Sequence, residues 1–129
     1  MRGIKFLLMS LSILWITCDT NPYRQGERLY NRYCANCHME DGTGLLSLYP
    51  ALNSPEFKRF KDQFACIVKN GLKDTLTIDQ KEFIFPMPAN PELNNVTIAN
   101  IYNYIVYKWH SDLPITNAIK VQSELENCP

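Results

Sequence analysis

The segment CANCH at residues 34–38 constrains the fold of this chain more than any other feature. Two thiols three positions apart can each add to one vinyl group of a porphyrin, and the histidine that follows is then held under the ring with a nitrogen facing the iron. This spacing is typical of c-type haem attachment. We therefore predict one covalently bound haem c, attached through Cys34 and Cys37, with His38 as an iron ligand.

The length and the charge limit what the rest of the chain can do. A chain of 129 residues holds one domain with a modest core, and a large cofactor at its centre would relieve that shortage. Aromatic residues make up 12% of the chain, which suits a core built around a flat apolar ring. The formal net charge is +0, so there is no basic field to collect a polyanion, and we expect no nucleic-acid partner.

Residues 1–17 have the pattern of an export signal. Two basic residues precede an apolar run at residues 6–16, which is too short to span a bilayer comfortably. The first alanine of the chain is Ala35, so an ordinary cleavage site of the Ala-x-Ala type is missing. The segment LWITC at residues 14–18 resembles a loose bacterial lipobox instead. We predict Cys18 as the lipidated mature N-terminus, with an uncleaved anchor and plain secretion as alternatives.

A short linker, residues 18–21, would follow the lipid. Only residues 19–21 separate the lipidated Cys18 from the first predicted helix. Three extended residues reach roughly 10 Å, so the haem would work close to the bilayer. The predicted location is the periplasmic side of a bacterial cell membrane, where the protein is held by its lipid anchor.

The other two cysteines need an explanation, because thiols of exported proteins tend to be paired or modified. Cys66 and Cys128 remain once the lipid and the haem have taken three of the five. A disulfide between them would close a loop of roughly 60 residues and contribute about 4 kcal/mol on the chain-entropy model. The alternatives are two buried, unreacted thiols, or a four-thiolate zinc site shared with Cys34 and Cys37. A redox-active dithiol is disfavoured by His38 and by the lack of a βαβ pattern.

Helical signals dominate the remaining sequence, and we predict an all-α fold of three to five helices. Asn-Pro at residues 21–22 starts a helix over 22–33, and apolar spacing predicts another over 95–110. Residues 54–71 form one bent helix or two short ones, and 120–127 form a short final helix. Residues 72–94 contain three prolines and are predicted as a loop. No segment alternates convincingly as a strand.

A second axial ligand for the iron has few candidates. Two of the four methionines leave with the export signal, and Met39 is tethered beside His38 on the wrong side of the ring. Met87 remains, and the prolines on either side of it stiffen an extended segment. A thioether opposite a histidine favours ferrous iron. His110 is the rival, but it follows a predicted helix and precedes two polar residues, so we expect it at the surface.

Several further pieces of the sequence occur in an order that belongs to one family. In chain order they are Gly26, Tyr30, Cys34 to His38, Asp41 to Gly44, Tyr49 to Leu52, Asn70, Gly71, Pro86 to Pro88 and Ile98 to Ile105. Over residues 22–109 the chain resembles the class I cytochromes c of the small bacterial kind. The resemblance implies the cytochrome c fold, wrapped around one haem with His38 and Met87 on the iron. It also implies that the Pro50 carbonyl accepts a hydrogen bond from His38.

The same resemblance implies that Gly26 and Tyr104 meet where the first and last core helices cross. Residues 22–110 would form the cytochrome c domain. Residues 111–129 go beyond the minimal pattern and are expected as an extension whose short helix packs on the domain.

The expected function is electron transfer rather than catalysis. The iron would alternate between Fe(III) and Fe(II), and the redox partners would be a quinol-oxidising complex, a terminal oxidase or a periplasmic dehydrogenase. The alternative is a haem-based peroxidase or gas sensor with a labile sixth ligand. That alternative needs an acid/base group near the iron, which the Pro-Met-Pro segment at residues 86–88 does not offer.

Overall fold

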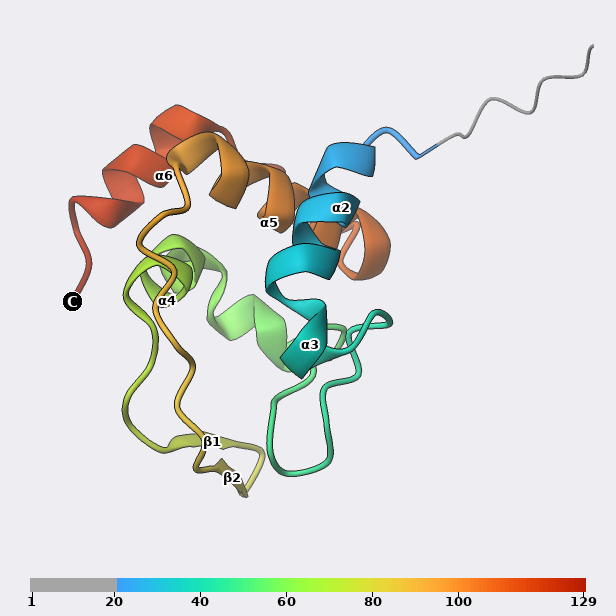
Figure 1. Ribbon diagram of the computed structural model, residues 1–129, viewed down its shortest axis with the longest axis vertical. Coiled ribbons are helices and arrows are strands. Elements are labelled where there is room, and N and C mark those ends of the chain that lie inside the picture. Colours follow the sequence, from blue (N-terminus) through green and yellow to red (C-terminus); the bar gives the residue numbers. More distant parts are fainter. Residues whose placement is uncertain (1–20) are drawn as a thin grey trace, which may run out of the picture.

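The computed structural model describes residues 21–129, and this part of the chain is mostly helical (Figure 1). The predicted export signal and Cys18 lie outside the described residues. The α-helices are α2 (Arg24–Tyr33), α3 (Ala35–His38), α4 (Phe64–Asn70), α5 (Asn95–Trp109) and α6 (Ala118–Leu125). Two 3₁₀ helices, η1 (Pro55–Arg59) and η2 (Lys61–Gln63), and the strands β1 (Leu76–Ile78) and β2 (Lys81–Phe83) complete the elements. Within residues 21–129, no helix combines the length and the apolar character needed to cross a bilayer.

Helices α2 and α5 cross at Gly26, as the resemblance implies. A Cβ atom at this position would lie 2.2 Å from the Asn100 carbonyl oxygen and 2.8 Å from the Tyr104 Cβ, so only glycine permits so close an approach. The rings of Tyr30 and Tyr104 pack beside the crossing with their centroids 5.5 Å apart. The crossing fixes the end of α2, where the attachment segment begins.

The first helix starts two residues later than predicted. Asn21 does not cap α2, because its side-chain oxygen accepts a hydrogen bond from the Tyr23 N–H at 2.8 Å and closes a turn ahead of the helix. The Asn21 amide then donates to Glu27 at 2.8 Å. The prediction that Asn21 caps the helix was therefore wrong, and Arg24 is the first helical residue.

The predicted loop at residues 72–94 contains a small antiparallel hairpin, which corrects the expectation that no strand is present. Leu76 pairs with Phe83 and Ile78 pairs with Lys81. The turn residues Asp79 and Gln80 both have positive φ, 49° and 64°, as two-residue hairpin turns require. Neither residue is glycine, so the usual sequence signal for this turn is missing.

Residues 54–71 divide into η1, η2 and α4 rather than one bent helix. Ser54 and Pro55 start η1 in the predicted way, and Gly71 ends α4 with a φ of +75°. Helix α6 packs against α4 and α5 (Figure 1). A disulfide between Cys66 and Cys128 joins α4 to the chain just after α6. The final helix lies at Ala118–Leu125, about two residues ahead of its predicted position.

Candidate functional site

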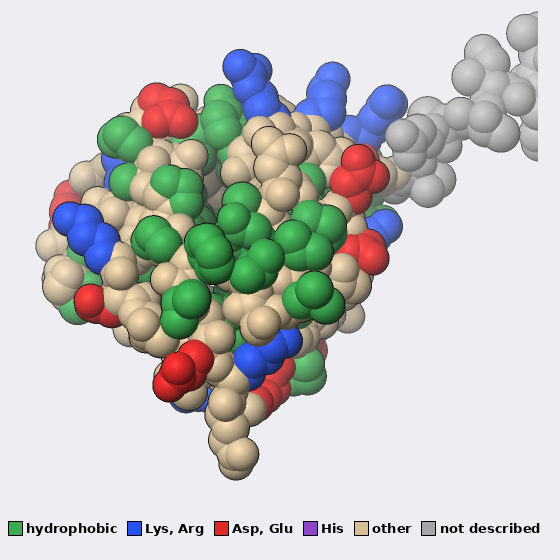
Figure 2. Space-filling view, turned by 60° about the horizontal axis from the view of Figure 1, so that its bottom comes forward, with side chains coloured by type: hydrophobic (Ala, Val, Ile, Leu, Met, Phe, Trp, Pro, Cys, Tyr) green, Lys and Arg blue, Asp and Glu red, His purple; other side chains and the backbone are tan. Residues whose placement is uncertain are grey.

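An apolar cavity lies between the end of α2, helix α4 and the hairpin, and its empty space, together with open solvent at its mouth, is about 1300 Å³. Hydrophobic side chains gather on the face of the molecule that carries the hairpin (Figure 2). The aromatic part of the lining consists of Tyr33, Tyr49, Phe57, Phe60, Phe64, Phe83 and Phe85. Among the described residues, the lining holds no lysine or arginine and no histidine except His38. Such walls suit a large apolar ligand.

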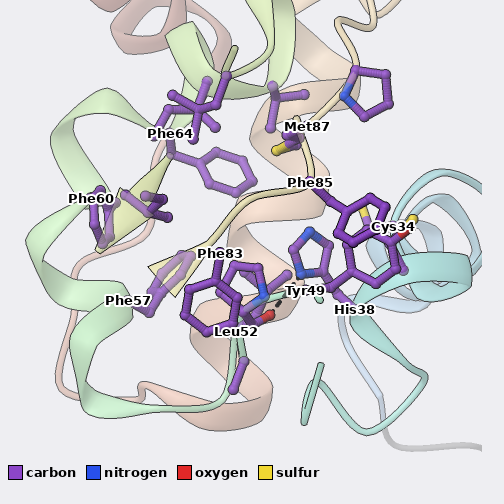
Figure 3. A pocket seen from close by; sticks show the side chains of 18 of the residues that line it. Cys34, His38, Tyr49, Leu52, Phe57, Phe60, Phe64, Phe83, Phe85 and Met87 are labelled. Atoms are coloured by element: carbon purple, nitrogen blue, oxygen red, sulfur yellow. Dashed lines mark hydrogen bonds between the residues drawn. The ribbon is translucent and has the colours of Figure 1, made fainter. Parts of the chain in front are cut away.

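His38 lies at one wall, held by the loop that follows α3. Its Nδ1 is 2.9 Å from the Pro50 carbonyl oxygen. A carbonyl only accepts, so Nδ1 carries the proton and the lone pair is on Nε2. The nitrogen that is not in this hydrogen bond faces the side of the cavity where the Met87 sulfur lies (Figure 3). Burial lowers the pKa of the His38 imidazole and the Pro50 carbonyl opposes this, so the ring is neutral and free to donate its lone pair at neutral pH.

Met87 lies at the opposite wall, in a segment that is pinned along its backbone. The Met87 N–H donates to the Leu72 carbonyl and the Leu72 N–H donates to the Met87 carbonyl, both at 2.9 Å. Gly71 makes this approach possible, because a Cβ there would lie 2.5 Å from the Met87 carbonyl oxygen. The thioether is therefore placed by two backbone hydrogen bonds without any regular helix or long strand.

Cys34 and Cys37 also line the cavity, on the same side as His38, and both are free thiols. Cys34 ends α2 and precedes α3, and its N–H donates to the Tyr30 carbonyl at 2.8 Å. The single turn of α3 then places Cys37 and His38 close to Cys34. Burial, and to a lesser extent the neighbouring Cys37, raise the pKa of the Cys34 thiol to about 12, so this thiol is protonated at neutral pH.

These side chains fit a covalently attached haem. The walls are mostly apolar, two free thiols lie at one side, and the His38 Nε2 faces inward with no hydrogen-bond partner among residues 21–129. A sulfur that can act as a soft ligand lies across the cavity (Figure 3).

Comparison with known families agrees with this geometry. The family described as cytochrome C oxidase, cbb3-type, subunit III, matches residues 21–105, which is most of the chain. The chain belongs to this family. It is therefore a c-type cytochrome, a protein that carries electrons by means of haem c, as the sequence predicted. Comparison with individually curated proteins finds no match.

One histidine of this cytochrome was placed wrongly by sequence reasoning. His110 is buried, with 3% of its surface exposed, and was expected at the surface. Its Nε2 donates to the Leu52 carbonyl at 2.7 Å, and its ring stacks on Phe57 with centroids 4.8 Å apart. It does not line the cavity. His110 thus fixes the loop that follows Pro50, a role that only its long-range partner reveals.

The other two cysteines of the cytochrome are not available for a zinc site. Cys66 and Cys128 are bonded to each other, and no three potential metal ligands of the His, Cys, Asp or Glu type converge within the described residues. The four-thiolate alternative therefore lacks half of its ligands.

Proposed function

We propose that this protein is a monohaem electron carrier in which His38 and Met87 ligate the iron and Cys34 and Cys37 hold the haem. The observation that supports this most directly is that the free His38 nitrogen and the Met87 sulfur face each other across one apolar cavity (Figure 3). Bound haem c supplies a one-electron Fe(III)/Fe(II) couple. His38 and Met87 would hold the iron on both redox levels, so that electron transfer would need little rearrangement of the protein.

The protein side chains perform four tasks in this proposal. Cys34 and Cys37 would hold the haem by two thioether bonds, each made by adding an S–H across one vinyl group with no leaving group. The Pro50 carbonyl orients the His38 ring and makes Nε2 a better donor. The Met87 thioether stabilises the ferrous state and raises the potential. The aromatic walls exclude water and keep the local dielectric constant low.

The partners and the location are part of the same proposal. The family description names an oxidase subunit, which supports a respiratory role near a terminal oxidase, a quinol-oxidising complex or a periplasmic dehydrogenase. We place the protein on the periplasmic side of the membrane with lipid on Cys18. Mass spectrometry of the N-terminus of the native protein tests this: a diacylglyceryl group on Cys18 supports it, and an unmodified or uncleaved N-terminus contradicts it.

The ligand set is tested by carbon monoxide binding to the reduced protein. The wild type should resist the gas, whereas Met87→Leu, which keeps the volume and removes the sulfur, should bind it and show a lower reduction potential. Met39→Leu is the matched control, because this methionine is tethered beside His38 and is not among the cavity-lining residues, and it should behave as the wild type. Rapid binding by the wild type would contradict the proposal and favour a gas sensor or peroxidase.

A further inference from the structure

We propose that the C-terminal extension positions Met87, with Cys66, Cys128 and Glu124 as the positioning residues. The inference rests on the proposed function in one respect, namely that Met87 is the iron ligand. Its structural basis is a chain of direct contacts that runs from the end of α6 through α4 to the segment at residues 86–93.

The first link joins α6 to the first turn of α4. Helix α4 has no capping side chain of its own, since Gln63 makes no cap hydrogen bond. The Glu124 carboxylate supplies this contact from α6, accepting the Ala65 N–H at 2.7 Å. The next residue, Cys66, is bonded to Cys128, which lies one helical turn beyond Glu124. Two adjacent residues of α4 are therefore held by two residues of the extension.

The second link joins α4 to the segment at residues 86–93. The Asn90 N–H donates to the Val68 carbonyl at 3.1 Å. The Lys69 ammonium donates to the carbonyls of Pro91 and Leu93, both at 2.7 Å. These bonds hold the end of the segment that lies beyond Met87.

The same segment is held on the Met87 side by the residues directly after α4. Leu72 makes two backbone hydrogen bonds with Met87, and Gly71 lies against the Met87 carbonyl. Because α4 is only seven residues long, the whole helix spans about 10 Å and its two ends move together. A displacement of the first turn therefore reaches the Met87 sulfur.

The residues before and within the segment at residues 86–93 give its backbone little support of their own. The hairpin that precedes the segment has only two strands of three residues each, and an isolated hairpin of this size is marginally stable. The prolines at positions 86, 88 and 91 have no N–H to contribute. The segment thus takes much of its position from α4. Helix α4 itself packs on α5, where the Phe64 and Tyr102 ring centroids lie 5.3 Å apart, and the extension adds the two links to its first turn.

The test is hydrogen exchange of the full-length holoprotein, measured by mass spectrometry on peptides that cover residues 64–72 and 86–93. We compare the wild type with Cys66→Ser/Cys128→Ser and with Glu124→Ala. Both variants should exchange at least about tenfold faster in residues 86–93, because a lost disulfide and a lost hydrogen bond to a charged group each commonly cost more than the free energy that corresponds to tenfold. Glu124→Gln keeps an acceptor for the Ala65 N–H and should restore the protection.

The matched control is Asn21→Ala, which weakens the start of α2 and leaves α4 untouched. It should raise exchange in α2 and not in residues 86–93. We call Cys66→Ser/Cys128→Ser and Glu124→Ala the clamp variants. Unchanged protection of residues 86–93 in both clamp variants would overturn the proposal. An equal loss of protection of residues 86–93 in the control would overturn it too. If the double cysteine variant does not fold, Glu124→Ala alone decides.

A second measurement separates this inference from the proposed function. The ferric protein is examined for the sulfur-to-iron charge-transfer band, which should weaken in the clamp variants and persist in Glu124→Gln. If the wild type itself shows no such band, the proposed ligand set fails, and the exchange data still decide whether the extension positions Met87. A band that keeps its full intensity in both clamp variants contradicts the inference while leaving the ligand set intact.

Discussion

Replacing Gly26 with alanine tests the packing on which the whole site depends. Gly26 lies in the middle of α2, where this helix crosses α5, and it is buried. An added Cβ would lie 2.2 Å from the Asn100 carbonyl oxygen and 2.8 Å from the Tyr104 Cβ, whereas ordinary contacts begin at 3.4 Å. The nearer atom belongs to the backbone of α5, so it cannot rotate away as a side chain would.

The expected loss of stability follows from two opposing effects. Overpacking in a well-packed core costs up to about 3 kcal/mol, and a clash with helix backbone belongs at the upper end of that range. Alanine is better than glycine in a helix by about 1 kcal/mol. The net loss in the free energy of unfolding should therefore be about 2 kcal/mol.

Urea unfolding of the holoprotein, followed by far-ultraviolet circular dichroism, measures this loss. Asn31→Ala is the matched control, because residue 31 is exposed on the same helix and alanine should raise its stability by a few tenths of a kcal/mol. If Gly26→Ala were as stable as the wild type or more stable, the two helices would not cross at this residue and the reasoning would be refuted.

Three further substitutions test other parts of the structure. Gly71→Ala should both strain a residue whose φ is +75° and push the Met87 carbonyl away, so we expect lower stability in urea and more carbon monoxide binding than in the wild type. His110→Phe keeps the ring but leaves the Leu52 carbonyl without its donor, which should cost about 1–3 kcal/mol in thermal unfolding; an unchanged melting temperature would contradict the buried hydrogen bond. Burial raises the pKa of the Glu124 carboxyl above its ordinary value of 4.5. Because folding then favours the protonated carboxyl, the free energy of unfolding should fall as the pH rises from the ordinary pKa through the raised one. Glu124→Gln should flatten this part of the curve of stability against pH, and an unaltered slope would show that another group causes it.

Local sequence signals predicted several elements correctly. The helix predicted over residues 95–110 is present at Asn95–Trp109, and Asn94 caps it by accepting the Thr97 N–H at 2.9 Å. Ser54 and Pro55 begin a 3₁₀ helix, and Gly71 ends α4. These signals are reliable because caps and turns are decided by side chains within a few residues of the backbone that they bind.

Other features escaped sequence reasoning because their partners are distant along the chain. His110 is buried by Phe57 and by the Leu52 carbonyl, which lies 58 positions earlier. Glu124 acts on Ala65, which is 59 positions away. Neither pair has a local pattern, so polarity alone suggested that His110 lies at the surface.

The attachment segment and the identity of the candidate ligands were determined by sequence alone, since their chemistry depends on residue type and on spacing within five positions. The family match agrees with that prediction, and the ligand set stays a prediction that carbon monoxide binding can test. Tertiary structure decided where the sulfur of Met87 lies. Its position depends on backbone hydrogen bonds to Leu72, and through α4 on a disulfide whose cysteines are 62 positions apart. The cysteine count predicted this disulfide, but the backbone groups that it links to Met87 are brought together only when the chain closes around its core.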